Sequence, residues 1–249
     1  MQRRLTGLIG LLALVTGLAL STAAAGAATP AHLAHRPPPR TSTTELSVVH
    51  GIPNLPVDIY VVKNLFSVRK LADVNFGTAA DLDSALPGFV TPGFYFVDVV
   101  AAGTSPFHPL LHAAFFLAPN QSKSVVAYVT ADAAGQAGHP TLGVFTNDVS
   151  STKGGARVTT RHTAVAPTVG VYAAGSVGIP ASFSNGQSFS GVVPAASYDV
   201  TVTAPNAPAT VLADLGSVAL PANTNTLAFA IGTFPATFQV VTLQIPTAS

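Results

Sequence analysis

Hydrophobic and polar side chains alternate with a period of two in many short segments of this chain. The clearest segments are 198–203 and 227–232, in which large apolar residues alternate with polar or small ones. This period is typical of β-strands that have one buried and one exposed face. Pro, Gly and Asn residues separate such segments, as at Pro87-Gly88, Pro92-Gly93 and Asn185-Gly186, and these residues favour turns. The pattern therefore predicts an all-β protein.

Helical periodicity is weak by comparison. Its best candidate is the segment from Asn64 to Asp73, where Leu65, Val68 and Leu71 follow a helical spacing. So short a segment is marginal as a helix in water. We expect at most a turn of helix there, between strands.

Two parts of the chain resemble each other over most of their length, which indicates an internal repeat. The segments 48–50 and 57–60 correspond to 160–162 and 169–172, and the segments 94–99 and 117–120 correspond to 197–202 and 220–223. The offset between the copies is 112 for the first two pairs of segments and 103 for the last two. The first copy therefore carries nine additional residues, which lie between Lys63 and Thr91.

Each copy has the size at which a sandwich of about seven strands buries an adequate core. We predict that residues 45–150 form the first β-sandwich repeat and residues 157–249 the second. A linker at 151–156 joins them, and its Ser, Thr and Gly content favours flexibility. The sequence leaves open how the two repeats are oriented, because interfaces between domains of one chain can be small and mobile.

The first 28 residues have the three parts of a secretory signal. Arg3 and Arg4 supply the positive charge, residues 5–20 the apolar segment, and residues 23–28 the small side chains of a cleavage site. We predict a signal peptide at 1–28, cleaved near Ala25 or Ala28, and a Pro-rich linker at 29–44. An uncleaved membrane anchor is the alternative, but the apolar segment is shorter than the roughly 20 residues that span a bilayer.

Composition narrows the possible partners. The chain has no Cys, which excludes disulfides and thiolate metal sites, and Lys+Arg 11 against Asp+Glu 10 leave a net charge of +1. Without a basic stripe, nucleic acid is not an expected partner. Between residues 156 and 249 the charged residues are Arg157, Arg161, Asp199 and Asp214. A surface with so few charges offers little resistance to association, although the compositional bias of an Ala-rich and Thr-rich exported proteome explains it equally well.

The repeat segments resemble a family of secreted bacterial proteins known as domain of unknown function 4397. The resemblance rests on Val48-Val49-His50, the turn Ile52 to Pro56, the segment Val57 to Val61, Phe76-Gly77 and the segment Pro92 to Val99. The second copy departs from the pattern, since Gly170 stands for Asp58 and Asn185-Gly186 for Phe76-Gly77. The resemblance implies a secreted protein of two immunoglobulin-like or prealbumin-like sandwiches. It implies no activity, because the family has none assigned.

His50 and His162 stand at the same position of the two copies. They could be ligands or bases of a shared site, but we favour a structural role in which each imidazole bonds the backbone of the following turn. No nucleophile motif accompanies either histidine. In the Pro-rich linker, His32 and His35 are expected to belong to an extended leader rather than to a metal site.

Two further patterns are weak candidates for metal sites. His108 and His112 have the four-residue spacing of a helical zinc motif, but the flanking Pro residues predict a loop that leads into a strand at Leu111 to Leu117. The segment Asp81-Leu82-Asp83-Ser84 lacks the frame of a calcium loop, so a solvated acidic loop is expected.

Asp58 and Asp98 lie within apolar strand segments, where an unpaired buried carboxylate is costly. We expect both on an outward face, and the face that Asp58 shares with Tyr60 is then either partly exposed or occupied by a partner. Tyr95 and Tyr198 each begin a strand after a Pro-containing turn, which favours tyrosine-corner hydrogen bonds.

These observations assign no catalytic, cofactor-binding or metal-binding residue. We therefore predict a secreted, extracellular protein without enzymatic activity, a binding or structural module of the bacterial cell envelope. A cell-wall polymer or another envelope protein is the expected partner, and no transmembrane span is expected in the mature protein. The alternative is an extracellular hydrolase that uses His50 with Asp58 or Asp98, which requires those side chains to converge within hydrogen-bond reach.

Overall fold

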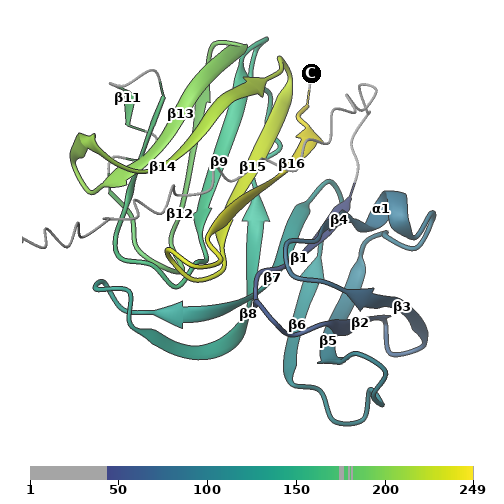
Figure 1. Cartoon of the computed structure of the whole chain (residues 1–249). Helices are drawn as coiled ribbons and strands as arrows, with labels where there is room; N and C mark the ends of the chain where they lie inside the picture. Colours follow the sequence, from purple (N-terminus) through teal and green to yellow (C-terminus); the bar gives the residue numbers. More distant parts are fainter. Residues whose placement is uncertain (1–43, 174–176, 179, 181, 249) are drawn as a thin grey trace, which may run out of the picture.

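The computed structural model describes residues 44–173, 177–178, 180 and 182–248. The predicted signal peptide at 1–28 lies outside the described residues, as do His32 and His35 in the linker at 29–44. Strands dominate the described part, which contains β1 to β16 and one short helix, α1 (Leu82–Ala85). The prediction of an all-β protein of two tandem sandwiches is confirmed (Figure 1).

The first sandwich consists of two four-stranded sheets. Its outer sheet has the order β3-β2-β5-β6 and its inner sheet the order β4-β1-β7-β8, in which β1 and β7 are parallel. One continuous apolar cluster, which includes Leu46, Val97 and Val125, fills the space between them. The strands are β1 (Glu45–His50), β2 (Val57–Lys63), β3 (Ser67–Val74), β4 (Ala79–Asp81), β5 (Gly93–Ala101), β6 (Leu111–Leu117), β7 (Ser122–Ala131) and β8 (Ala137–Asn147).

The second sandwich repeats this topology with every label raised by eight. Its outer sheet has the order β11-β10-β13-β14 and its inner sheet the order β12-β9-β15-β16, with β9 and β15 parallel. The register is repeated as well, because Tyr60 pairs with Asp98 and Tyr172 with Thr201. The strands are β9 (Ala156–His162), β10 (Gly170–Ala173), β11 (Val177–Gly178), β12 (Ser188–Val193), β13 (Ala196–Ala204), β14 (Ala207–Leu220), β15 (Thr224–Ile231) and β16 (Gln239–Pro246).

Equivalent turns lie at Phe76-Gly77 and Asn185-Gly186. The Gly77 amide donates to the His50 carbonyl at 2.9 Å, and the Gly186 amide donates to the His162 carbonyl at 2.7 Å. Both glycines have a positive φ, 86° and 82°, a backbone conformation that side chains disfavour. The correspondence between these two turns, expected from the repeat, is confirmed.

The two sandwiches pack against each other through their inner sheets. Val49, Val126 and Tyr128 of the first sandwich join Phe229 and Leu243 of the second in one buried apolar cluster. Each inner sheet is therefore covered on both faces, by its own outer sheet and by the other sandwich. The linker alone does not decide the relative orientation, which the sequence had left open.

Arg161 on β9 lies in this interface and is 1% exposed. Its guanidinium donates to Asn147 Oδ1 at 2.6 Å and lies 4.9 Å and 5.2 Å from the ring centroids of Phe145 and Phe229. Burial lowers the pKa of Arg161 to about 10. Asn147 also forms hydrogen bonds with Ser124 and Ser122. A polar network therefore lies next to the apolar part of the interface.

The expectation of a helical turn within Asn64 to Asp73 is wrong, because Ser67–Val74 is strand β3. Asn64 and Leu65 both have positive φ, and the Phe66 amide donates to the Lys63 carbonyl at 3.2 Å. This is the geometry of a type I′ turn, whose twist suits a two-stranded hairpin. Pairing with β2 thus overrides the helical spacing of the apolar residues.

Candidate functional site

His50 and His162 have the structural role predicted for them. Both are completely buried. His50 Nε2 lies 2.6 Å from the Leu55 carbonyl oxygen, and His162 Nε2 lies 2.9 Å from the Pro167 carbonyl oxygen, five residues further along the chain in each copy. Burial lowers the pKa of both imidazoles, which favours the neutral form. Each histidine thus bonds the turn that follows its strand.

The two predicted tyrosine corners are also present. Tyr95 donates its hydroxyl hydrogen to the Thr91 carbonyl at 2.7 Å, and Tyr198 donates to the Pro194 carbonyl at 2.9 Å. Each bond spans four residues and ties the start of a strand to the turn before it.

Asp58 lies on the outward face of its strand, as expected, but it is 1% exposed rather than solvated. Its carboxylate accepts hydrogen bonds from the amides of Asp73 and Gly103, both at 2.9 Å, and forms an ion pair with Lys70 at 2.8 Å. The hydrogen bond from Lys70 is the largest cause that lowers the pKa of Asp58 to about 2. Neighbouring groups, rather than water, therefore compensate this charge.

Asp98 lies on the same outward face, opposite His112 of β6. His112 Nδ1 is 2.5 Å from Asp98 Oδ1. The predicted strand at Leu111 to Leu117 is confirmed as β6, and His108 lies in the loop before it. His50, by contrast, lies on the inner sheet and bonds its own turn, so the structure does not bring it together with Asp58 or Asp98.

The segment Asp81 to Ser84 is not the solvated acidic loop that the sequence predicts. Asp81 caps the N-terminus of α1, accepting from the Asp83 amide at 3.0 Å and the Ser84 hydroxyl at 2.8 Å. Among the described residues, no group of three or more His, Asp or Glu side chains is arranged to hold a metal ion.

The outward face of the outer sheet β3-β2-β5-β6 is organised in rows that cross the strands. One row is ionic and aligns Lys70, Tyr60, Asp98 and His112. The Lys70 ammonium lies 5.6 Å from the Tyr60 ring centroid. Strand pairing therefore brings polar and titratable groups of four strands side by side.

The next rows of this face are apolar. Val68, Val62 and Phe96 are aligned in one row, and Phe94 lies opposite Phe116 in the next. The rings of Phe94 and Phe96 are 5.1 Å apart in an edge-to-face arrangement. We call these five side chains the aromatic face.

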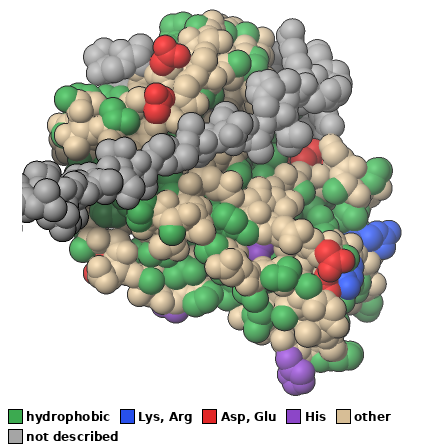
Figure 2. Space-filling view, in the orientation of Figure 1, with side chains coloured by type: hydrophobic (Ala, Val, Ile, Leu, Met, Phe, Trp, Pro, Cys, Tyr) green, Lys and Arg blue, Asp and Glu red, His purple; other side chains and the backbone are tan. Residues whose placement is uncertain are grey.

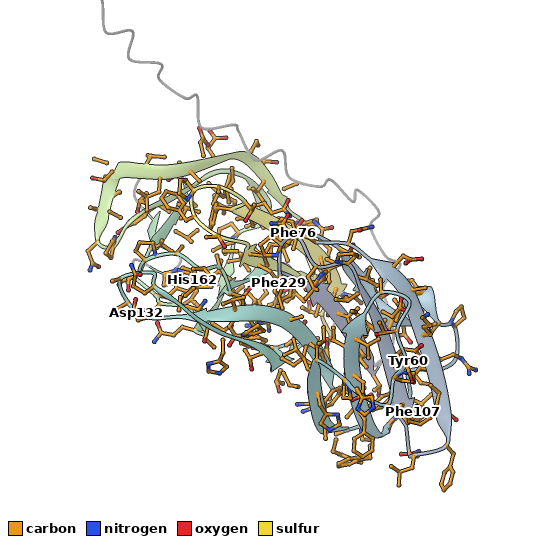
Figure 3. The ribbon with its side chains drawn as sticks, turned by 60° about the horizontal axis from the view of Figure 1, so that its bottom comes forward. Tyr60, Phe76, Phe107, Asp132, His162 and Phe229 are labelled. Carbon is orange, nitrogen blue, oxygen red and sulfur yellow. The ribbon has the colours of Figure 1, made fainter. Side chains whose placement is uncertain are left out.

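The aromatic face is open to solvent. Phe94 is 43% exposed, Phe116 57% and Val68 49%, and the adjoining hairpin tip adds Phe66 at 90%. Two hydrogen bonds between Asn64 and the backbone of Phe94 hold this tip against β5. Exposed apolar surface with a polar border is a mark of interaction sites. Figure 3 places Tyr60 of this sheet at one end of the molecule and His162 toward the other.

Among the described residues, the outer sheet of the second sandwich has no counterparts of these phenylalanines. The positions of Phe94, Phe96 and Phe116 are taken there by Ser197, Asp199 and Ala219, as the paired registers show. The space-filling view shows few charged side chains and many uncharged ones across the visible surface (Figure 2). The visible surface thus carries few charges in both sandwiches. The aromatic rows, by contrast, belong to the first sandwich.

The sequence indicated that the face of Asp58 and Tyr60 is exposed or occupied by a partner. It did not indicate a role for Phe94, Phe96 and Phe116 on that face. The available signal was their alternation with core residues: Phe94 and Phe96 alternate with Tyr95 and Val97, which are buried. A strand with two apolar faces packs only one of them into the core of its own sandwich. The other face is either covered by another part of the protein or a partner, or exposed to solvent.

No family model matches the chain, and no curated protein matches it either. Among solved structures, the chain is similar to a putative cell adhesion protein from Bacteroides ovatus ATCC 8483, with 9% identity, a TM-score of 0.26, and coverage of 84% of this chain and 99% of that one. The Bacillus anthracis TIE protein has 10% identity and a TM-score of 0.22 over 81% of this chain. This alignment spans about a third, 34%, of the Bacillus anthracis chain.

Within the described residues, no helix has the length and apolar character needed to cross a membrane.

Proposed function

We propose that the protein is a non-catalytic binding module of the bacterial cell envelope, exported by its signal peptide, and that the aromatic face is its contact surface. The observation that carries the proposal is the exposure of Phe94, Phe116 and Val68 on one face of a sheet. Interface centres are rich in aromatic side chains and poor in charge, with polar groups at the rim. The aromatic rows and the ionic row beside them have this arrangement.

The chemistry of the face favours another envelope protein over a wall polymer. A sugar chain needs free hydrogen-bonding groups near the rings on which it stacks. Here the polar groups next to the rings are engaged with each other, Asp58 with Lys70 and Asp98 with His112. The valines add aliphatic surface that suits an apolar protein patch.

Capture of an envelope fraction on the immobilised protein tests the proposal. The double substitution Phe94→Ser and Phe116→Ala is expected to reduce capture at least tenfold, because aromatic anchors contribute most of the energy of such contacts. Phe189→Ser is the matched control, since Phe189 is 36% exposed on β12 of the second sandwich. The control is expected to bind like the wild type.

Digestion of the envelope fraction identifies the class of partner. Protease treatment is expected to abolish capture, and muramidase treatment to leave it intact. The reverse result would replace the protein partner by a wall polymer. Equal binding of the double variant and the wild type would refute the aromatic face as the contact surface.

A further inference from the structure

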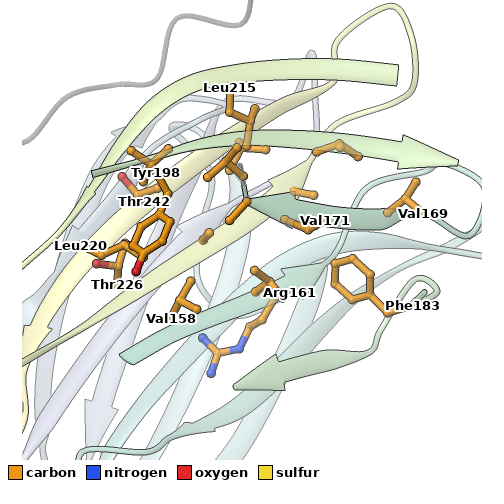
Figure 4. A pocket seen from close by; sticks show the side chains of 18 residues that line it. Val158, Arg161, Val169, Val171, Phe183, Tyr198, Leu215, Leu220, Thr226 and Thr242 are labelled. Carbon is orange, nitrogen blue, oxygen red and sulfur yellow. The ribbon is translucent and has the colours of Figure 1, made fainter. Parts of the chain in front are cut away.

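The second sandwich contains a cavity of about 60 Å³ between its two sheets. Its lining is formed by strands of both sheets and includes Val158, Ala173, Val218 and Ala228. Figure 4 shows these walls, with Tyr198, Leu220 and Thr226 at one end and Val169 and Phe183 at the other. The Arg161 guanidinium points away from the other lining side chains, toward the partner Asn147 described above. The cavity surface is therefore uncharged.

The repeat explains why this cavity exists. Val61, Phe115 and Val125 belong to the filled core of the first sandwich. In the second sandwich the same register positions hold Ala173, Val218 and Ala228, and all three line the cavity. Each of these three replacements removes methyl groups or a ring from the space between the sheets.

In the inner sheet of the second sandwich, the large side chains of β15 lie on the face that packs against the first sandwich. On β15, Leu227, Phe229 and Ile231 point toward the first sandwich, whereas Ala228 and Ala230 face the cavity. The buried residues between the sheets accordingly form three separate clusters instead of one. An underfilled apolar interior of this kind stays dry and accepts small apolar molecules.

The cavity has an opening on one side. Val200, Val218 and Ala228 all line it and are half-buried, whereas their counterparts Val97, Phe115 and Val125 in the first sandwich are buried. Lining residues of β9 and β10, such as Val158 and Val171, are buried. The opening therefore lies between the edge strands β14 and β16, which Gln244 joins at one point by a 3.4 Å hydrogen bond to the Ala219 carbonyl.

We propose that this cavity binds a single unbranched alkyl chain. The lining extends along β13 from Tyr198 to Val202, a length of about 13 Å at the rise of a β-strand. A volume of only about 60 Å³ over such a length favours a slender chain over ring systems and branched groups. The uncharged lining offers no partner for an ionic head group, so the head remains in solvent at the opening between β14 and β16.

Titration of the isotope-labelled full chain with 1-octanol, followed through backbone amide NMR shifts, tests this proposal. Shifts are expected in β9, β10 and β13 to β16. Affinity is expected to rise about fourfold per methylene from 1-butanol to 1-octanol, which corresponds to about 0.8 kcal/mol for each buried methylene. The bulky probe 1-adamantanol is expected to bind at least tenfold more weakly than 1-octanol.

Two variants restore residues of the filled sandwich. Ala228→Val and Ala173→Val copy Val125 and Val61, and each is expected to weaken 1-octanol binding at least tenfold. Ala209→Val is the matched control, because Ala209 is exposed on β14 and does not line the cavity, and it is expected to bind within twofold of the wild type. Amide spectra of both sandwiches report whether each variant is folded.

Two results would overturn the proposal: equal affinity of Ala228→Val and wild type, or octanol-induced shifts confined to the aromatic face. Neither result bears on envelope capture, so this inference and the proposed function can fail separately. Phosphatidylcholine vesicles in a parallel titration distinguish the sources of the chain. Cavity shifts with vesicles that are lost in Ala228→Val indicate a membrane lipid, and shifts with soluble amphiphiles alone indicate a free one.

Discussion

The two sandwiches share strand order and register but have diverged on opposite faces. The first has a continuous core and an outward face of exposed phenylalanines. The second has Ser197 and Ala219 on that outward face and small residues around an internal cavity. Both keep the buried histidine and the tyrosine corner that tie turns to strands.

This difference teaches which interactions the topology requires. The turn contacts are local and involve backbone groups that must be satisfied when buried, so each copy needs them. The filling of a sandwich is less strictly required here, because the inner sheet of the second copy is covered by the first copy. Packing between the sandwiches supplies apolar burial that the hollow interior lacks.

The largest expected effect is a difference in unfolding free energy between equivalent core substitutions in the two sandwiches. Leu117 and Leu220 occupy equivalent positions, and both are buried. Leu117→Ala is expected to cost about 4 kcal/mol of unfolding free energy, and Leu220→Ala about 2 kcal/mol, because fewer atoms surround a side chain beside a cavity. Urea unfolding measures both values. Equal costs would show that the two cores are packed alike.

A reciprocal exchange is expected to have the next largest effect. Val125→Ala introduces the residue of the second copy and is expected to cost about 2 kcal/mol, from lost burial and a new cavity. Ala228→Val fills the existing cavity and is expected to add about 1 kcal/mol. Thermal unfolding and amide exchange of β7 and β15 report the changes. A destabilised Ala228→Val protein would mean that the cavity cannot accept the two methyl groups.

Acid is expected to weaken the outer sheet of the first sandwich more than the outer sheet of the second. The pKa of Asp58 is lowered to about 2 in the folded protein, so its ionised form adds stability above pH 4 that is lost as the pH falls from about 4 to 2. Asp58→Asn is expected to be less stable at pH 7, and its deficit should shrink toward pH 2. Amide exchange of β2 and β10 measures this, because Gly170 replaces the carboxylate in the second copy. Parallel acid responses of β2 and β10 would contradict it.

The smallest effect is expected at the aromatic face. The double substitution Phe94→Ser and Phe116→Ala copies the second sandwich and is expected to change the unfolding free energy by less than about 0.5 kcal/mol, since exposed positions contribute little to folding. Urea unfolding provides the value. A cost above 2 kcal/mol would show that these rings stabilise the fold rather than form a binding surface.

Local patterns predicted the strand β6, the turns at Gly77 and Gly186, and the bonds of His50 and His162, because each depends on residues within a few positions. The pattern at Leu65 failed for a tertiary reason. Pairing of β3 with β2 and a type I′ turn with positive φ at Leu65 outweigh its helical spacing. The Asp81 cap was missed because an acidic cap and an acidic loop have the same composition.

Sequence alone determined that this chain forms two copies of an all-β unit, because a period of two and an internal offset are properties of residue order. It also located the outward face that carries Tyr60. Only the tertiary structure decided what covers each face. The alternation of apolar and polar residues shows that a strand has two different sides. It does not show whether a second sheet, the other sandwich, a cavity or solvent lies against each side. The burial of Arg161, the pairing of Asp58 and the hollow of the second sandwich all follow from that missing information.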